Sequence, residues 1–267
     1  MSCEVVTTRD GARAILDRAT GEVMHPVVGP AIESMRLYCE PARLRARLRT
    51  GEGPLVLFDV GLGAGSNAIA AWRISEDMVG EGRRLEIVSF DHSLAAIELA
   101  LQHPGDFGFE GGAGEAARAV LAQGCHETRR TRWRVVQGSL PGVLQAEPAG
   151  GADVVFWDPF SPRANPELWT VAAFTALRRC CRAGATVHTY SGATAVRSGL
   201  LLAGFAVGVG AATGEHKAAT CAAVEIGDLE RPLDRRWLAR LGRSTAGFPS
   251  DAPADALARI AALPQFA

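Results

Sequence analysis

Short apolar runs alternate with segments of helical length along most of the 267 residues of the chain. Such runs, bounded by turn residues, are typical of buried strands. We predict five strands separated by helical segments, and this alternation favours a mainly parallel sheet. Two further runs lie close enough in sequence to form an antiparallel hairpin at the end of the sheet. The seven predicted strands cover residues 55–60, 85–91, 133–137, 153–157, 185–190, 205–210 and 219–226.

The segments around these strands divide the chain into three predicted parts. Residues 1–50 form an N-terminal extension with a helix over 31–48, residues 51–227 form the α/β domain, and residues 228–267 form a Pro/Ala-rich tail. Glycine-rich residues 105–124 are expected to form a loop and a short helix. The other predicted helices cover residues 68–79, 92–101, 164–181 and 194–203, with helix-like stretches in the tail at 233–241 and 254–263.

A glycine-rich turn, Asp59-Val-Gly-Leu-Gly-Ala-Gly-Ser-Asn67, follows the first of these strands. A strand, a glycine turn and a helix start form the place where an open α/β sheet binds a nucleotide-like ligand. A dinucleotide fingerprint requires glycine at its sixth position, which is Ser66 here. Glycine at the first, third and fifth positions suits S-adenosylmethionine (SAM), because bare backbone lets its amino-acid end approach; a purely structural loop is the alternative. The predicted cofactor contacts in this turn are Asp59, Gly61, Gly63, Gly65 and Asn67.

A second carboxylate stands at the end of the next predicted strand, at Asp91. In nucleotide-binding α/β units, a carboxylate in this position accepts hydrogen bonds from the ribose hydroxyls. Aspartate is also a good helix N-cap, so Asp91 could instead cap the following helix, or do both.

Composition narrows the class of protein. The six cysteines lack C-x-x-C spacing and indicate reduced thiols in a cytoplasmic protein, and the six scattered histidines predict no metal site. Neither a signal peptide nor a membrane-spanning run is expected.

The formal net charge of -1 gives no global field that favours nucleic acid. Arginine clusters at 43–49 and 129–134 could supply a local one, although such clusters are commonly solvated faces.

The predicted chemistry lies in the loop Asp158-Pro-Phe-Ser-Pro-Arg-Ala-Asn-Pro-Glu-Leu-Trp169. Asp158 follows the fourth strand, at the edge of the sheet where doubly wound folds bind ligands. Asp-Pro-Phe is similar to the Asp-Pro-Pro-aromatic loop of methyltransferases that act on amino groups. In that loop a carboxylate and a backbone carbonyl accept hydrogen bonds from the nitrogen, while the aromatic ring packs on the base. A proline-rich turn with Asn165 capping the next helix is the alternative.

The same loop, together with Thr189-Tyr-Ser191, Ala195-Val-Arg197, Ala203-Gly-Phe205 and Gly214-Glu-His-Lys217, resembles the MnmC-like methyltransferase family in this order. This family contains the methyltransferase domain of the bifunctional tRNA 5-methylaminomethyl-2-thiouridine biosynthesis protein. The resemblance covers residues 8–226. It implies a Rossmann-like class I SAM-dependent methyltransferase with a mainly parallel, seven-stranded sheet that ends in an antiparallel hairpin. The implied reaction is N-methylation of 5-aminomethyl-2-thiouridine at the tRNA wobble position.

The resemblance also implies roles for residues of this chain. Asp158 and Phe160 become the catalytic candidates, with Asp158 also near the cofactor. Gly138 and Ser139 would contact the adenine, although the family usually has an acidic residue where Ser139 stands. Expected substrate contacts are Pro159, Arg163 and Lys217. The arginine cluster, and the position of Arg163 in the proline-rich loop, suggest Arg43, Arg45, Arg47 and Arg163 as tRNA contacts independently of the resemblance.

Two other readings stay open. One is a methyltransferase or spermidine-synthase-like enzyme that acts on a small amine, although no Gly-Gly-Gly-Asp-Gly turn is present. The other is a non-catalytic domain of the same fold. If tRNA is the substrate, we expect a separate FAD-dependent oxidase to supply it, because the chain is too short for that half of the bifunctional protein.

Overall fold

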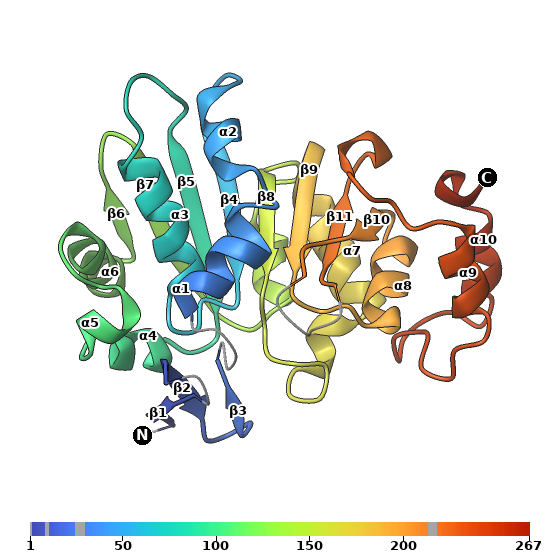
Figure 1. The fold of residues 1–267 in the computed structure, drawn as a ribbon, viewed down its shortest axis with the longest axis horizontal. Coiled ribbons are helices and arrows are strands. Elements are labelled where there is room, and N and C mark those ends of the chain that lie inside the picture. Colours follow the sequence, from blue (N-terminus) through green and yellow to red (C-terminus); the bar gives the residue numbers. More distant parts are fainter. Residues whose placement is uncertain (1, 9–10, 25–29, 213–217) are drawn as a thin grey trace.

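A mixed sheet forms the centre of the protein (Figure 1). The computed structural model describes residues 2–8, 11–24, 30–212 and 218–267. Eight strands lie in the order β10-β11-β9-β8-β4-β5-β7-β6, and the pairs among β9, β8, β4, β5 and β7 are parallel. The strands are β4 (Leu55–Val60), β5 (Leu85–Asp91), β6 (Cys125–Glu127), β7 (Thr131–Gln137), β8 (Ala152–Trp157), β9 (Cys181–Thr189), β10 (Ala206–Val209) and β11 (Thr220–Ala223).

All seven predicted strands are present in this sheet, including the terminal hairpin of β10 and β11. The eighth strand, β6, pairs antiparallel with β7 at the opposite edge. Sequence analysis missed it because it has three residues and includes His126 and Glu127, so it lacks an apolar pattern.

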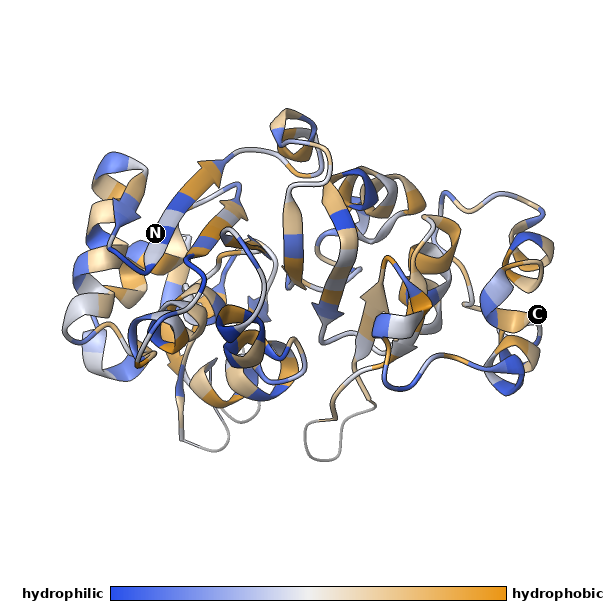
Figure 2. Ribbon diagram, turned by 90° about the horizontal axis from the view of Figure 1, so that it is seen from above, coloured by the Kyte–Doolittle hydropathy of each residue, from blue (hydrophilic) through white to orange (hydrophobic). Residues whose placement is uncertain are grey.

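Both faces of the sheet are buried, as the near-continuous apolar runs of the parallel strands require. Successive residues of β4 show this, since Leu57 belongs to one apolar cluster and Phe58 to the other. Helices α3 (Ser66–Glu76), α4 (Ala95–Ala100) and α6 (Gly112–Gln123) pack in the first cluster, and α7 (Val171–Cys180) and α8 (Thr194–Leu202) pack in the second. Figure 2 shows both hydrophobic and hydrophilic residues along the outer helices, which fits helices that bury one side.

The N-terminal part differs from the prediction. Strands β1 (Cys3–Thr7), β2 (Arg13–Asp17) and β3 (Glu22–Val23) form a separate antiparallel sheet. The single helix predicted over 31–48 is instead α1 (Pro30–Glu33), a π-helix η1 (Ser34–Cys39) and α2 (Leu44–Arg49). Pro41 explains the break, because proline removes a helical donor and clashes with the preceding turn. The chain then restarts through Arg43, which has φ 52°.

Several other predicted helices differ from the structure only in where they begin or how they are divided. The helix predicted over 92–101 begins only at Ala95, and the one predicted over 164–181 begins as a separate 3-10 turn, η3 (Pro166–Trp169). The glycine-rich stretch 105–124 contains α5 (Pro104–Phe107) and α6. Two more 3-10 turns are η2 (Gly142–Ala146) and η4 (Ile226–Asp228).

The C-terminal segment covers the edge of the main sheet at β10. It contains α9 (Arg235–Leu241), α10 (Ala256–Ala261) and the 3-10 turn η5 (Pro264–Phe266), and the side chains of Trp237, Ile260 and Phe266 are buried in the second apolar cluster. The Gln265 amide accepts a hydrogen bond from the Val207 N–H at 2.9 Å and donates one to its carbonyl at 2.7 Å. An exposed strand edge is thereby satisfied by a side chain. Within the described residues, no helix is long and apolar enough to cross a membrane.

Candidate active site

The glycine turn after β4 has a backbone that favours glycine. Gly61, Gly63 and Gly65 have φ values of 89°, 51° and 84°, in the left-handed region that residues with a Cβ rarely adopt. The N–H of Gly61 donates to the Phe90 carbonyl at 3.0 Å, so the turn is tied to the end of β5. The turn therefore lies at the carboxyl edge of the parallel strands, where the sequence placed it.

Asp91 connects the ends of β4 and β5. One carboxylate oxygen accepts a hydrogen bond from the Gly63 N–H at 2.9 Å, and the other accepts one from the Ser93 N–H at 3.1 Å. The hydrogen bond between His92 and this carboxylate raises the pKa of the imidazole. Helix α4 starts after Leu94, whose side chain makes no capping bond, so Asp91 does not cap that helix. Its local role is to hold the glycine turn.

A cavity of about 1200 Å³ opens at this edge of the sheet. The small N-terminal sheet forms part of the cavity wall, through Cys3, Asp17, Glu22 and the adjacent Met24. The described residues contain no cluster of His, Cys, Asp and Glu that could hold a metal ion, and all six cysteines are free. The sequence-predicted residues that line the cavity are Gly61, Gly63, Asp91, Gly138, Ser139, Asp158, Pro159 and Phe160.

Asp158 is held by donors from two distant elements. Its N–H continues the sheet pattern by donating to the Val60 carbonyl at 2.8 Å. The Tyr38 hydroxyl, from η1, donates to one carboxylate oxygen at 2.5 Å, and the Asn67 amide, from α3, donates to the other at 2.7 Å. Burial, and then the charge of Asp158, raise the pKa of Tyr38 well above its ordinary value, so this phenol stays a donor.

The rest of the proline-rich loop is fixed in the same way. The Pro159 carbonyl accepts a hydrogen bond from the Tyr190 hydroxyl at 3.1 Å, and the Phe160 carbonyl accepts one from the Trp169 indole at 2.8 Å. The Glu22 carboxylate, from β3, accepts hydrogen bonds from the Ser161 N–H, at 2.9 Å, and from its hydroxyl. Tyr190, Trp169 and Glu22 therefore hold the loop by hydrogen bonds, and Phe160 lines the cavity.

Three predicted cofactor contacts, Asp59, Gly65 and Asn67, are not among the described residues that line the cavity. Asp59 is 1% exposed and accepts a hydrogen bond from the Ser89 hydroxyl at 2.8 Å. Gly65 precedes α3 and packs where a Cβ would lie 2.9 Å from Ile97. Asn67 acts through Asp158. The sequence of a strand-turn-helix unit does not reveal which of its carboxylates and glycines face the ligand. The path of the turn in the folded protein decides this.

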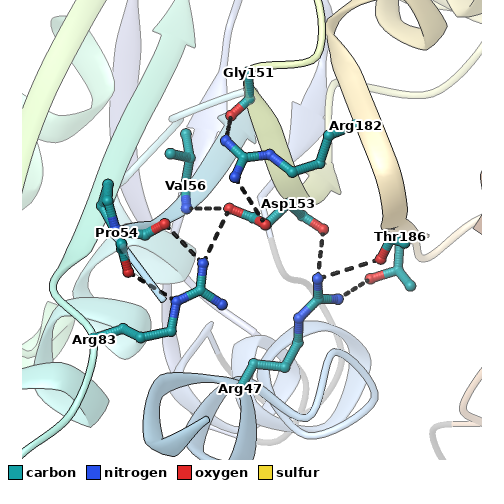
Figure 3. A network of polar contacts seen from close by, with 10 residues as sticks. Arg47, Pro54, Val56, Arg83, Gly151, Asp153, Arg182 and Thr186 are labelled. Carbon is teal, nitrogen blue, oxygen red and sulfur yellow. Dashed lines mark hydrogen bonds and ion pairs between the residues drawn. The ribbon is translucent and has the colours of Figure 1, made fainter. Parts of the chain in front are cut away.

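The predicted tRNA contacts are scattered. Arg163 is exposed on the active loop, Arg43 and Arg45 are exposed at α2, and Lys217 lies outside the described residues. The prediction for Arg47 is corrected, because its guanidinium donates to Thr186 and to the carbonyls of Asp153 and Gly184 (Figure 3). The Asp153 carboxylate also has Arg83 and Arg182 at 3.8 and 3.4 Å. This network lies at the start of β8, whereas Asp158 lies beyond its end.

Sequence analysis missed the site residues contributed by other parts of the chain. Tyr38 lies 120 positions before Asp158, and Glu22 lies 139 positions before Ser161. Tyr190 lies in the motif Thr189-Tyr-Ser191, which by itself assigns it no role. One signal was available, since the chain has only two tyrosines, yet their spacing gives no reason to bring them together.

Comparison with known proteins shows which proteins this chain is similar to. A family model described as S-adenosyl-L-methionine-dependent methyltransferase matches residues 118–225. The tRNA 5-methylaminomethyl-2-thiouridine biosynthesis bifunctional protein MnmC of Methylibium petroleiphilum is 31% identical over 212 residues, which are 76% of this chain and 32% of that protein. The protein of the same description from Ralstonia nicotianae is 34% identical over 65% of this chain and 27% of its own length. The chain thus spans less than a third of these curated relatives.

Solved structures support the fold. The crystal structure of MNMC2 from Aquifex aeolicus matches with a TM-score of 0.70 and 23% identity, over 98% of this chain and 86% of that one. A probable spermidine synthase from Corynebacterium glutamicum matches with a TM-score of 0.52 and 15% identity, over 92% and 85% of the two chains. The findings confirm the predicted resemblance, the Rossmann-like methyltransferase fold and SAM as the cofactor.

Proposed function

Because this chain is a SAM-dependent methyltransferase related to the methyltransferase part of the MnmC proteins, we propose that it methylates the amine of 5-aminomethyl-2-thiouridine at the tRNA wobble position. One observation supports the choice of an amine above all. The Asp158-Pro159-Phe160 loop lines the same cavity as Gly61, Gly63 and Asp91. A carboxylate for the nitrogen, a ring for the base and a cradle for the cofactor are thus close together.

The cavity residues fit SAM. Gly61 and Gly63 present backbone to the cavity without side chains, as the amino-acid end of the cofactor requires. Asp91 supplies the carboxylate for the ribose hydroxyls, and the turn at Gly138 and Ser139 lies where the adenine would bind. Ser139 is a weaker acceptor for the adenine amino group than a carboxylate.

Bound SAM supplies a sulfonium methyl group to an in-line displacement by the amine. In that displacement the amine nitrogen would form the new N–C bond, sulfur would keep the electron pair of the broken C–S bond, and the amine would lose one N–H proton. Asp158 accepts a hydrogen bond from the amine, orients it and offers an acceptor for that proton. Phe160 packs against the uracil ring, where base–aromatic stacking is worth about 1–3 kcal/mol.

The proposal extends to partners. A separate FAD-dependent oxidase would supply the aminomethyl substrate, and a tRNA substrate places the protein in the cytoplasm. Exposed Arg163, beside the catalytic residues, is the candidate phosphate contact.

A small cationic amine is the second candidate, and the charge of the cavity favours it. Its described lining includes six carboxylate residues and neither lysine nor arginine. Such a wall attracts an ammonium group and repels phosphate. A tRNA substrate would therefore insert only its base and keep its backbone outside. The acidic lining residues are Asp17, Glu22, Glu33, Asp91, Asp158 and Glu167.

Methyl transfer to tRNA tests the proposal directly. We expect the protein and SAM to convert 5-aminomethyl-2-thiouridine in tRNA to its N-methyl form, as measured by mass spectrometry of the nucleosides. Asp158→Asn should lower the rate by about 10²–10⁴-fold while SAM still binds. Binding of tRNA should weaken steeply with salt, because phosphate contacts release counterions. If the protein methylates small primary amines and leaves tRNA unmethylated, the second candidate is the correct one.

A further inference from the structure

We propose that Tyr38 and Tyr190 are a pair of positioning residues that fix the two acceptor groups for the amine, the Asp158 carboxylate and the Pro159 carbonyl. The inference rests on the proposed function in one respect, that the methyl acceptor is an amine. These are the only two tyrosines of the chain. Their hydroxyls donate to two consecutive residues, at 2.5 and 3.1 Å.

Both phenols are held rigidly by aromatic neighbours. The Tyr38 ring packs on Phe156 with 5.3 Å between ring centroids, and the side chain is 0% exposed. The Tyr190 ring meets Trp169 edge-on, with centroids 5.8 Å apart and an interplanar angle of 80°. Since the Trp169 indole itself donates to the Phe160 carbonyl, three consecutive loop residues each accept a hydrogen bond from an aromatic side chain. Aromatic side chains lose little entropy in such an arrangement, because they have few rotatable bonds.

The loop needs this external support. Pro159 and Pro162 have no backbone N–H, so the loop has few donors with which to order itself. The two tyrosines come from elements that are far apart in sequence, one from η1 and one just after β9. Their separation in sequence means that the loop reaches its working shape only when the whole domain is folded.

The two hydrogen bonds have different consequences, because only one acceptor is charged. Tyr38 donates to a carboxylate, and a hydrogen bond to the ionised form favours that form. Tyr190 donates to a neutral carbonyl and sets only its direction. Burial raises the pKa of both phenols, with Asp158 adding to the effect, so both stay protonated donors at neutral pH. Tyr38 and Tyr190 both interact electrostatically with Asp158. The other described ionisable residues that line the cavity are Cys3, Asp17, Glu22, Glu33, Asp91, His92 and Glu167.

Two single-atom deletions separate these roles. Tyr38→Phe should lower kcat/KM about 10- to 100-fold, the range for a hydrogen bond to a charged group, and move the acid limb of its pH profile to higher pH. The limb moves in this direction because loss of the donor raises the pKa of Asp158. Tyr190→Phe should lower kcat/KM about 2- to 10-fold and leave the acid limb in place. Neither variant should change SAM affinity by more than about twofold, since both act on the acceptor side.

A matched control is Thr131→Val, which also deletes one fully buried hydroxyl, one that has no hydrogen-bond partner and lies at the opposite end of β7 from the site. Its kcat/KM should equal that of the wild type. Unchanged kcat/KM and pH profile in Tyr38→Phe would overturn the proposal, as would an equal shift of the acid limb in both tyrosine variants.

An absorbance titration of phenolate in the wild-type protein, without substrate, keeps the test independent of the acceptor and of whether the variants fold. Both tyrosines should remain un-ionised past pH 10, where exposed tyrosines titrate, until the protein unfolds. Titration of both phenols near pH 10 in the folded protein would overturn the inference. If the wild type methylates a small amine and leaves tRNA unmodified, the proposed tRNA function fails, and the profiles measured with that amine still decide the role of the pair.

Discussion

Gly61 and Asp158 approach each other so closely that a Cβ on Gly61 would lie 2.6 Å from the Asp158 carbonyl oxygen. The glycine turn and the loop that begins at Asp158 are therefore in direct backbone contact. A glycine at this position serves two demands at once, a positive φ and an approach that no other residue permits.

We expect Gly61→Ala to abolish SAM binding and to destabilise the protein by more than the backbone strain alone. Gly204→Ala is a matched control, because Gly204 has φ 88° and a Cβ added there would meet no described residue within 4 Å. That control should cost about 1–2 kcal/mol, the penalty for a left-handed residue with a Cβ. Urea unfolding and SAM calorimetry measure both variants. If Gly61→Ala and Gly204→Ala lose equal stability, the Asp158 backbone moves away from the new Cβ at no measurable cost.

Asp91→Asn should weaken SAM by about 1.5–3 kcal/mol, the value of a hydrogen bond to a charged group. The amide keeps the size of the side chain but removes the charge that the ribose hydroxyls would meet. Asp106→Asn, at a surface carboxylate that faces Arg13 at 3.5 Å, is the control and should bind SAM normally. Calorimetry compares the two. Normal affinity in Asp91→Asn would restrict Asp91 to holding the Gly63 N–H.

Arg47→Ala should destabilise the fold by about 1–3 kcal/mol, because it removes a donor that Asp153, Gly184 and Thr186 share. Its tRNA affinity should equal that of the wild type. Arg45→Ala, at an exposed position of the same helix, should change stability by less than about 0.5 kcal/mol. Denaturant unfolding and filter binding give the two readouts. A loss of tRNA affinity in a fully stable Arg47→Ala protein would show that Arg47 contacts tRNA.

His188 should make the protein less stable as the pH falls below its ordinary pKa of 6.5. Burial lowers the pKa of this imidazole to about 3 in the folded state, so between pH 6.5 and 3 the unfolded chain binds the extra proton. Between pH 8 and 5 the wild type should lose about 2 kcal/mol of unfolding free energy through this group. Nearly all of this loss occurs below pH 6.5, where the slope approaches about 1.4 kcal/mol per pH unit. His188→Gln should lack this part of the slope, as measured by urea unfolding at each pH. Parallel pH dependences would show that His188 is protonated in the native state.

Local patterns were enough to predict the five parallel strands, the terminal hairpin and the two acidic strand ends. Parallel strands buried on both faces must be apolar throughout, so β4, β5 and β8 stand out in the sequence, and the residues after them necessarily meet at one edge. Asp91 and Asp158 were found for this reason. The same logic failed for β6, whose three residues pair along an edge and need no apolar pattern.

The sequence by itself determined the sheet, the cofactor class and the loop that carries Asp158. Only the tertiary structure decided which residues of the turn face the cavity, which support it from behind, and which distant side chains complete it. Tyr38, Glu22 and Tyr190 reach the loop through contacts that are 31 to 139 positions apart in sequence. Periodicity and spacing record the burial of each element on its own, whereas such contacts depend on how the elements pack together.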